Sequence, residues 1–561
     1  MQGVQELGHG VKVSAGFKEQ YPEIFDSSLI EYLSKLHRHF EIRRQQLLAC
    51  RGIRARHYHQ GKLPEYGLRD SVVVCGDWRV APLPADYQQR RVEITGPVND
   101  PKMVVKMLSR GSDGFRADTA MLDFEDSMKP TFKNVLNGVR NVRQAARGEL
   151  SFSSGEKEYH LDSQDMAGLM VRVRGLHLRE ANLTVDDQPV SAGLFDFAMC
   201  FFHSVGPLLR AGKTPKYYVP KCEHYLEARW WNDLFTQAQE LLGIERGTLR
   251  ATFLIETLPA AFQIEEILYE IREHAAGLNV GRWDKIFSDI KTLKMQEKRI
   301  SCDRSEIGMD SFWMDNYAKR LVKICHERGA MAIGGMSAFT PGSDSSIRKR
   351  QTAKVLADKQ NECSIGHDGC WVSHPYFIGT ALSAFPKKNQ LEEKLESFNR
   401  FPNLIMDCQS APTLEGLRKN IRVGIGYLEG WSRDLGCVAW DDQMEDLATL
   451  EISRAQTWQW LHHGVILKGG EPVNPSLIAA VFEEELYRIL FEIDERFANL
   501  EAANINQIKL SYVRAKVVAK ELFLKEELSD FLCESSDIEE AESVLPQILP
   551  KTENQPIEVS L

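Results

Sequence analysis

Between about residues 90 and 400, short apolar runs alternate with longer helical patterns. The runs are rich in Val, Ile, Phe and Ala, and there are eight: "VEITGPV", "TAMLDFED", "GLMVRVRGL", "KYYVPK", "ATFLIETLP", "AGLNVGRWD", "AMAIGGMSAF" and "CWVSHP". Apolar runs that alternate with helices are typical of parallel strands joined by crossover helices. Eight such units predict an α/β fold, a closed (β/α)8 TIM barrel; a doubly wound open sheet is the alternative, although it seldom needs eight units.

The sequence on either side of these runs has a helical pattern. In "SSLIEYLSKLHRHFEIRRQQLLACR" the apolar residues recur every three or four positions, as they do in "TLEGLRKNIRVGIGYLEGWSRDLG" and "PSLIAAVFEEELYRILFEIDERF". The last residues are acidic and contain prolines, which is typical of a flexible tail. We therefore predict four parts: an N-terminal helical segment (1–88), the barrel (89–405), a C-terminal helical plug (406–530) and an acidic flexible tail (531–561).

Composition excludes several classes of function. The net charge is −10 and no basic stripe is visible, so nucleic acid is not an expected partner. The most apolar stretch, "GLFDFAMCFFHSVGPLL", contains Asp196 and His203, so we expect no membrane span. The 11 cysteines are scattered without a C-x-x-C pair, which indicates reduced thiols rather than a zinc ribbon or a disulfide framework. Neither an export signal nor a C-terminal peroxisomal tripeptide is present, so we expect a cytoplasmic enzyme.

Charged side chains stand at the ends of four of the eight runs. They are Asp123, Glu125 and Asp126 in the second run, Arg172 and Arg174 in the third, Glu256 in the fifth and Asp284 in the sixth. Active sites of such barrels lie at the carboxyl ends of the strands. A single charged residue there could equally close the rim with a salt bridge, but four strands that end in this way favour an active site.

Two of these carboxylates indicate a metal. Glu256 and Asp284 end neighbouring predicted strands, so both should point into one mouth, where one of them would have to take up a proton. A divalent cation removes this conflict, and Mg²⁺ typically takes one or two protein carboxylates. Asp123, Glu125 and Asp126 would then form an outer acidic layer that orients metal-bound water. A metal beside an arginine suits a small anionic oxo-acid.

Other motifs are less specific. The Gly-Arg-Trp-Asp sequence at 281–284 suggests a backbone that approaches a ligand closely. "SSIRKRQTAKVLADK" is either a solvated helix face or a patch that attracts phosphate. "GIGYLEG" lacks the G-x-G-x-x-G spacing and follows a helical pattern, so we do not interpret it as a dinucleotide site.

One longer block resembles a known family. "REHAAGLNVGRWDKIFSDIKTL" is similar to the signature of malate synthase. "RRVEITGPV", "DFEDSMKP", "VRVRGLHL", "LIETLPAAFQIEEIL", "GHDGCWVSHP" and "MEDLATLEISRAQTWQWLHH" also resemble blocks of that family, in the family's order. The resemblance spans roughly residues 10 to 530 and is strongest to the shorter A-type form, since no further domain-sized insertion is visible.

The resemblance implies a chemistry: acetyl-CoA, glyoxylate and water give malate and free CoA, a step of the glyoxylate cycle. It implies Mg²⁺ held by Glu256 and Asp284, and backbone N–H groups of Gly281, Arg282 and Trp283 that bind the glyoxylate carboxylate. Arg172 would polarise the aldehyde oxygen and steady the enolate, Asp446 would remove the methyl proton, and Pro375 is a candidate acetyl-CoA contact. Because Asp446 lies outside the barrel region, the plug would have to fold over the mouth.

One position departs from the family, and two alternatives stay open. Lys285 stands where the family commonly has Tyr; it would either lean away as a cation of the barrel rim or weaken metal binding. The alternatives are a related TIM-barrel lyase of CoA esters, against which the "MEDLAT" plug argues, and an inactive CoA-binding scaffold, for which only Lys285 speaks. We expect a monomer or weak self-association.

Overall fold

The computed structural model describes residues 3–155, 157–534 and 536–545 of the 561 in the chain. The chain divides into two compact units. The first unit comprises residues 1–56, 64–282 and 315–404. The second comprises residues 57–63, 283–314 and 405–561. The longest segment of the second unit begins at residue 405, one residue before the boundary predicted from the sequence. The two earlier segments of this unit were not predicted.

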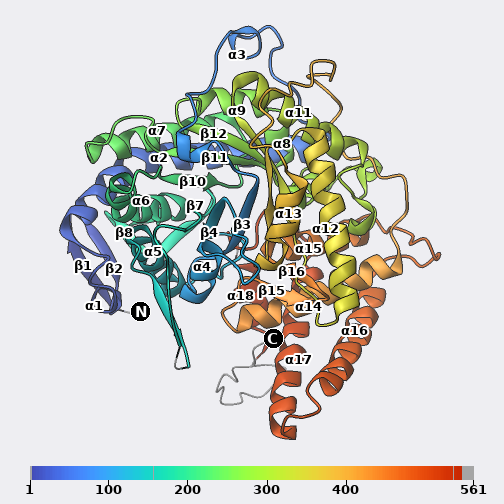
Figure 1. Cartoon of the computed structure of the whole chain (residues 1–561). Coiled ribbons are helices and arrows are strands. Elements are labelled where there is room, and N and C mark those ends of the chain that lie inside the picture. Colours follow the sequence, from blue (N-terminus) through green and yellow to red (C-terminus); the bar gives the residue numbers. More distant parts are fainter. Residues whose placement is uncertain (1–2, 156, 535, 546–561) are drawn as a thin grey trace. The chain divides into compact units, whose positions relative to one another are not determined.

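Within the described residues, the first unit contains a closed barrel of parallel strands (Figure 1). Its strands in barrel order are β3 (Val92–Pro97), β4 (Thr119–Asp123), β7 (Gly168–Arg172), β10 (Lys216–Val219), β11 (Arg250–Ile255), β12 (Ala275–Val280), β13 (Met331–Ser337) and β14 (Gly369–Val372), which pairs with β3. Each strand lies within one of the eight predicted runs or begins one residue before it. The predicted TIM barrel is confirmed.

The strands form because both of their faces are buried. Every residue of β4, β10, β11, β12 and β14 is buried, as expected for a parallel sheet that has helices outside and side chains inside. The barrel interior is filled by the buried residues Tyr87, Met121, Met170, Tyr218, Leu254, Ala276, Met331, Ile333 and Trp371. The inside of this barrel is therefore filled with side chains, and a ligand can bind only at its ends.

Helices follow the barrel strands in the chain. They are α4 (Pro101–Leu108), α5 (Phe132–Arg147), α6 (Ala192–Arg210), α7 (Tyr225–Leu241), α8 (Leu258–Ala261), α9 (Ile264–Glu270), α10 (Arg282–Leu293), α11 (Phe312–Arg328), α12 (Ser345–Ile365) and α13 (Ile378–Ala384). Local signals start several of them: the Asp100 carboxylate accepts the backbone N–H of Lys102 at 2.8 Å, with Pro101 in the first turn of α4.

Helix α6 is the apolar stretch that the sequence analysis set aside as a membrane span. By length and composition alone it could cross a membrane, but it is mostly buried inside the structure. Its Asp196 is fully buried and accepts two hydrogen bonds from the Arg174 guanidinium, at 2.7 and 2.9 Å. This placement is that of a core helix with a paired buried charge.

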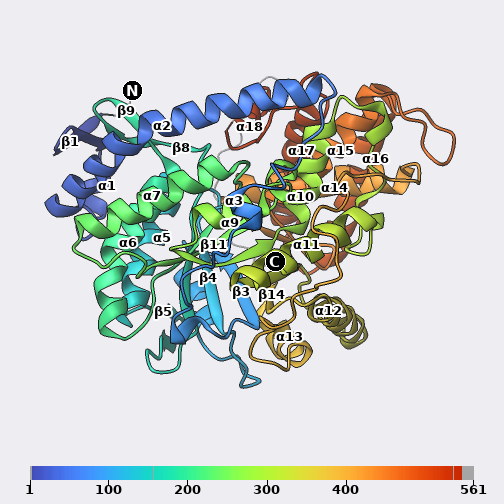
Figure 2. The same ribbon diagram turned by 90° about the horizontal axis from the view of Figure 1, so that it is seen from above.

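The N-terminal segment is only partly helical. Helix α2 (Ser27–His59) is one long helix, as expected (Figure 2). However, β1 (Val4–Gly8) and β2 (Val11–Ser14) precede it and join β8 (Arg179–Val185) and β9 (Gln188–Ser191) in an antiparallel sheet. The helical segment predicted for 1–88 is therefore present as α2, but it is preceded by two strands. Strand β1 pairs with β2, and β2 pairs with β8, some 170 residues further along the chain.

The shorter elements of the first unit complete it: α1 (Phe17–Gln20), α3 (Val72–Cys75) and the antiparallel hairpin of β5 (Ser151–Ser154) and β6 (Lys157–His160). None of them contributes a predicted site residue.

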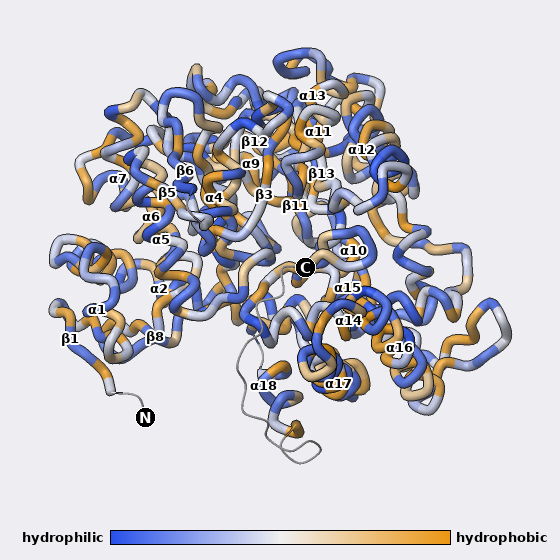
Figure 3. Tube along the Cα trace, turned by 60° about the horizontal axis from the view of Figure 1, so that its bottom comes forward, coloured by the Kyte–Doolittle hydropathy of each residue, from blue (hydrophilic) through white to orange (hydrophobic). Residues whose placement is uncertain are grey.

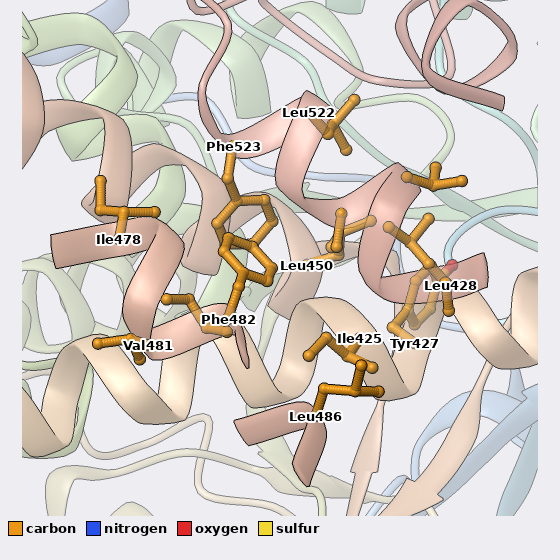
Figure 4. Packing of buried hydrophobic residues seen from close by; sticks show 14 of the residues in the cluster. Ile425, Tyr427, Leu428, Leu450, Ile478, Val481, Phe482, Leu486, Leu522 and Phe523 are labelled. Carbon is orange, nitrogen blue, oxygen red and sulfur yellow. The ribbon is translucent and has the colours of Figure 1, made fainter. Parts of the chain in front are cut away.

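The second unit is mainly helical. It contains α14 (Leu414–Ser432), α15 (Leu447–His462), α16 (Pro475–Arg496), α17 (Ala502–Phe523) and the short antiparallel pair β15 (Val438–Trp440) and β16 (Gln443–Glu445). Buried residues of these helices form one hydrophobic cluster, including Ile425, Leu450, Phe482 and Phe523 (Figure 4). Hydrophobic and hydrophilic residues are mixed along α16 and α17 (Figure 3), as expected of helices that bury one side.

The "GIGYLEG" glycines belong to this packing. A Cβ atom at Gly424 would lie 2.8 Å from the Phe523 ring, and one at Gly426 would lie 2.7 Å from the Trp440 ring. At Gly430 it would lie 2.1 Å from Val438. The three glycines therefore let α14 approach its neighbours closely, which accounts for them without a dinucleotide.

The predicted flexible tail begins too early. Within residues 531–545, Phe531, Leu532, Ile538 and Ala541 are buried, and α18 (Asp537–Glu542) forms a further turn of helix. Leu532, Ile538 and Ala541 belong to the hydrophobic cluster of the second unit. Because acidic residues separate these apolar residues, the sequence analysis interpreted the segment as a flexible tail. Residues 546–561 of the predicted tail lie outside the described residues.

Candidate active site

Charged side chains from neighbouring strands meet at the carboxyl end of the barrel. Asp123 is the last residue of β4, Arg172 is the last residue of β7, and Glu256 directly follows β11. Glu125 and Asp126 follow β4 in the chain. All five side chains are buried. These five residues and Lys221 are joined by ion pairs at one end of the barrel. We call the six residues the mouth cluster.

Asp123 and Arg172 form a bidentate ion pair. The Arg172 Nε and Nη2 atoms donate to the two Asp123 carboxylate oxygens at 2.7 and 2.5 Å. Asp123 is itself fixed, because it also accepts the Glu125 N–H at 2.9 Å and the Ser127 hydroxyl at 2.5 Å. The remaining Arg172 Nη1 lies 3.1 Å from a Glu125 oxygen, and the guanidinium carbon lies 5.6 Å from the centre of the Trp371 ring. Arg172 is therefore a rigidly oriented cation.

Lys221 is a member of the mouth cluster that the sequence analysis did not single out. Its Nζ lies 2.7 Å from Asp126, 3.0 Å from Glu125 and 3.8 Å from Glu256. Its backbone N–H donates to Glu256 Oε1 at 2.7 Å. The signal was present, since the run "KYYVPK" ends in this lysine at the same end of the barrel as the other charges.

The mouth cluster contains four carboxylates and two cations. Burial, and then the charge of Asp126, raise the pKa of Glu125 well above its ordinary value. Burial also disfavours the charged form of Asp126, but Lys221 and Arg172 outweigh it and lower the pKa of that residue. A divalent cation would balance the excess negative charge, so the donor chemistry fits Mg²⁺. Yet no three His, Cys, Asp or Glu side chains among the described residues form a ready coordination site.

Gly281 lies directly against Glu256. A Cβ atom on Gly281 would lie 2.5 Å from the Glu256 Cβ and 2.8 Å from its Oε2. The glycine is therefore required by space, because a side chain would displace the Glu256 carboxylate. The Gly281 N–H donates to the Tyr317 hydroxyl at 3.2 Å. The sequence suggested a close approach to a ligand, and in the structure the close neighbour of Gly281 is the Glu256 side chain.

The rest of the Gly-Arg-Trp-Asp motif opens α10. Arg282 begins the helix and belongs to the first unit, whereas Trp283 and Asp284 belong to the second, with Asp284 in the first helical turn. The four backbone N–H groups at a helix start lack partners within the helix, and the helix dipole favours an anion there.

Lys285 forms a buried ion pair within α10. Its side chain is fully buried, and its Nζ donates to Asp289 Oδ1 at 2.5 Å, one helical turn further on. Burial raises the pKa of Asp289 to about 6, against the opposing effect of Lys285. The departure from the family at this position is thus accompanied by a matching carboxylate, and Lys285 is not the rim cation that the sequence analysis considered.

Asp446 lies in the second unit at the start of α15. It is the N-cap residue: its side chain accepts the Thr449 N–H at 3.3 Å, and the Thr449 hydroxyl accepts the Asp446 N–H at 3.0 Å. Its carboxylate is therefore directed by a fixed helix start. Trp283, Asp284 and Asp446 share the second unit, while the mouth cluster and Gly281 share the first.

Pro375 follows β14 and opens a short 3-10 helix, η4 (Pro375–Phe377). It is partly exposed, and it lies after the last barrel strand in the first unit, at the same end as the mouth cluster. The basic segment forms the N-terminal part of α12, in which Lys349 and Arg350 are exposed and Lys359 is buried beside Glu362.

A TIM barrel with an oriented arginine among buried carboxylates at the carboxyl ends of its strands is an enzyme scaffold. Three family descriptions match the chain: "Malate synthase, N-terminal domain" at residues 9–68, "Malate synthase, TIM barrel domain" at 168–405 and "Malate synthase, C-terminal" at 411–536. The chain belongs to the malate synthase family.

Individual relatives agree with this assignment. The chain is 44% identical over 508 residues to the malate synthase of Myxococcus xanthus, covering 89% of this chain and 93% of that protein. It is 41% identical over 490 residues to malate synthase A of Escherichia coli, covering 86% and 91%. Among solved structures, the Haloferax volcanii malate synthase pyruvate/acetyl-CoA ternary complex is similar at 14% identity and a TM-score of 0.42, covering 75% of this chain and 98% of that one. This last likeness is too distant to carry an argument about the site.

Proposed function

We propose that this chain is a Mg²⁺-dependent malate synthase of the glyoxylate cycle that condenses acetyl-CoA with glyoxylate and hydrolyses the thioester to give malate and CoA. The observation that carries the proposal is the mouth cluster, in which a rigid arginine and an excess of carboxylates occur in a chain of this family. The match of the malate synthase C-terminal family to residues 411–536 favours this activity over that of a related lyase without a plug.

Glu256 and Asp284 are the residues that would hold Mg²⁺. Glu256 is positioned by the Lys221 N–H, and Gly281 leaves room for its carboxylate. Asp123, Glu125 and Asp126 would orient water around the ion. When bound, the ion supplies Lewis-acid polarisation of the aldehyde oxygen of glyoxylate.

Backbone N–H groups at the start of α10 would bind the carboxylate of glyoxylate. Those of Arg282 and Trp283 belong to the first turn of the helix, where an anion is favoured. The Gly281 N–H could join them by exchanging its bond to the Tyr317 hydroxyl. A small carboxylate held here is oriented before the reaction, which removes part of the entropic barrier.

Arg172 and Asp446 would act on acetyl-CoA. The methyl group of a thioester is a weak acid, so its enolate requires a positive charge that is already in place. Arg172 can supply this charge without reorganisation because Asp123 holds two of its nitrogen atoms. Asp446 would take up the methyl proton, with Pro375 beside the bound acetyl-CoA.

The proposal is tested by the release of free thiol from acetyl-CoA, with glyoxylate present and absent. We expect release only with glyoxylate, its loss in EDTA and its recovery with Mg²⁺. Formation of malyl-CoA from acetyl-CoA and glyoxylate without free thiol, or cleavage of malyl-CoA to these two compounds, would favour the lyase. Binding of acetyl-CoA with neither thiol release nor malyl-CoA formation would favour the inactive scaffold. Activity that resists chelation would contradict the roles given to Glu256 and Asp284.

The base is tested separately with Asp446→Asn. Asn is as good an N-cap as Asp, so α15 should keep its start while the base is lost. We expect turnover to fall by about 10²- to 10⁴-fold with acetyl-CoA binding retained, since this is the usual contribution of a positioned base. Asp442→Asn, a change of an exposed carboxylate four residues earlier, is the matched control and should remain fully active. Undiminished turnover of Asp446→Asn would refute its assignment.

A further inference from the structure

Two cysteines that lie far apart in the sequence meet in the second unit. Cys302 lies between the 3-10 turns η2 (Glu297–Arg299) and η3 (Arg304–Glu306), and Cys408 lies in the stretch that leads to α14. Their sulfur atoms are 3.0 Å apart. A disulfide bond has a length of about 2.05 Å, so the sulfurs would need to approach by only about 1 Å to bond.

The segments that carry the two thiols are tied together on both sides of the pair. We call residues 299–306 the strap. Arg299 Nη1 donates to the Met406 carbonyl at 3.1 Å and lies 3.2 Å from Asp407. On the other side, the Asp303 carboxylate accepts the Thr413 N–H at 2.9 Å and its hydroxyl at 2.5 Å. The Ser410 hydroxyl also donates to Glu306. These contacts on both sides of the pair therefore hold the two cysteines close together.

This pair differs chemically from the other buried cysteines. Burial raises the pKa of Cys200, Cys325 and Cys370 well above the ordinary value, which makes those thiols inert. In contrast, the contact between the two sulfur atoms lowers the pKa of Cys302 and raises that of Cys408. Cys302 is buried, but Cys408 is partly exposed, so a small oxidant can reach the pair from its side.

We propose that Cys302 and Cys408 form a modification site that a peroxide oxidises reversibly to a disulfide. One thiolate attacks the peroxide, breaking its O–O bond; the sulfur becomes a sulfenic acid and one water or alcohol leaves. The second thiol then attacks that sulfur and displaces hydroxide, which leaves as water. The two thiols lose two electrons and two protons in total, and the peroxide gains them.

The disulfide would stabilise the strap, which packs against α15. The strap lies against this helix: the Gln456 side chain donates to the Cys302 carbonyl at 2.7 Å, and Trp460 Nε1 donates to the Ser301 carbonyl at 2.8 Å. Arg304 lies 3.3 Å from Glu445, directly before Asp446. A disulfide from Cys302 to Cys408 would close a long chain loop and fix the strap where it already lies, so it should stabilise the second unit.

The site is tested by peptide mapping of the full-length protein after mild treatment with hydrogen peroxide. Remaining thiols are then alkylated under denaturing conditions before trypsin digestion. Cleavage after arginine gives the peptides Ile300–Arg304 and Phe401–Arg418, each with one cysteine. We expect these two peptides to be joined, and dithiothreitol to separate them. Cys302→Ser and Cys408→Ser should abolish the linked species, whereas Cys50→Ser, a change of an exposed thiol, should not.

The proposal is overturned if Cys302 and Cys408 are alkylated as fully as in untreated protein at a peroxide level that oxidises Cys50. It is also overturned if either residue is recovered only as sulfinic or sulfonic acid, or joined to another cysteine. The outcome does not depend on activity, so it stands or falls separately from the proposed function.

The stabilising effect has its own readout. The unfolding midpoint of the oxidised protein should lie several degrees above that of the reduced protein, and the two midpoints should coincide in Cys408→Ser. An oxidised protein that unfolds at the same or a lower temperature would overturn the inference that the bond fits the present backbone.

Discussion

Two of the buried charge clusters in the described part of the barrel unit differ in the balance of their charges. In its interior, Arg90 and Glu93 form an ion pair at 2.8 Å. Glu93 also accepts hydrogen bonds from Thr119 at 3.0 Å, Tyr218 at 2.5 Å and Trp371 at 2.9 Å. This interior cluster has one cation and one anion, and hydrogen bonds satisfy both Glu93 oxygens. The mouth cluster has four carboxylates and two cations.

The difference shows that buried charge alone does not mark a functional site. The interior cluster is neutral overall, and its charged groups compensate each other through an ion pair and hydrogen bonds. The mouth cluster has more carboxylates than cations, and burial, followed by the charge of Asp126, raises the pKa of Glu125. Trp371 lies between the two, because it donates to Glu93 and faces Arg172. The imbalance is what an added cation would correct.

The largest expected effect of a single change is on stability, in the interior cluster. Glu93→Gln should destabilise the protein by about 3–5 kcal/mol, because it leaves the fully buried Arg90 without its counter-charge. The matched change in the mouth cluster, Glu125→Gln, replaces a carboxyl group whose charged form is disfavoured by burial and by Asp126. It should leave the unfolding free energy of the metal-free protein unchanged or higher. Chemical denaturation of both variants measures the contrast. Equal losses in the two variants would remove the distinction between the clusters.

The next effect is on turnover, in the mouth cluster. Arg172→Lys keeps the positive charge but loses the planar guanidinium group that Asp123 orients through two hydrogen bonds. Turnover should therefore fall by about 10²- to 10³-fold. Arg90→Lys makes the same exchange in the interior cluster and should leave the turnover of folded protein close to that of the wild type. Steady-state kinetics with acetyl-CoA and glyoxylate compare the two. If Arg90→Lys were as damaging to turnover as Arg172→Lys, the interior cluster would have a catalytic part.

The smallest effect is a pH dependence of stability. The pKa of Glu125 is raised in the fold by burial and by Asp126, so its contribution is complete below the ordinary glutamate pKa of about 4.3 and is lost as the pH rises toward the folded value. The shift of Asp126 has the opposite sign and acts only as the pH falls below about 3.9. Above pH 5 the metal-free wild type should therefore lose stability relative to Glu125→Gln, by at most about 1.4 kcal/mol per pH unit. Urea unfolding in EDTA at pH 5 and pH 8 measures this difference, and a difference that does not change with pH would contradict the raised pKa.

Much of the barrel could be predicted from sequence because its signal is local. Each strand is a short run that is buried on both faces, and each run ends where the charged residues begin. Since parallel strands present their carboxyl ends at one edge, Asp123, Arg172 and Glu256 could be brought together from the order of the runs alone. Lys221 could have been added by the same rule.

The remainder depends on contacts between distant segments. Strand β2 pairs with the distant β8, and the strap packs on α15 although some 150 residues separate them. A pairing between distant segments produces no periodic pattern of apolar residues within either segment, so the sequence alone does not indicate it. In α18, two apolar residues among acidic ones are buried while Glu539 and Glu540 stay exposed, and composition alone could not indicate this. For Asp446 the sequence predicted a catalytic base, and that role stays a prediction beside the helix cap that the structure describes.

The central claim is that the mouth cluster binds a divalent cation through Glu256. Calorimetric titration of the purified, metal-free protein with Mg²⁺ tests it directly, with Glu256→Gln and Arg90→Lys titrated in parallel. We predict one binding site per chain in the wild type and in Arg90→Lys, and none in Glu256→Gln. Binding of Mg²⁺ by Glu256→Gln with the affinity of the wild type would contradict the account.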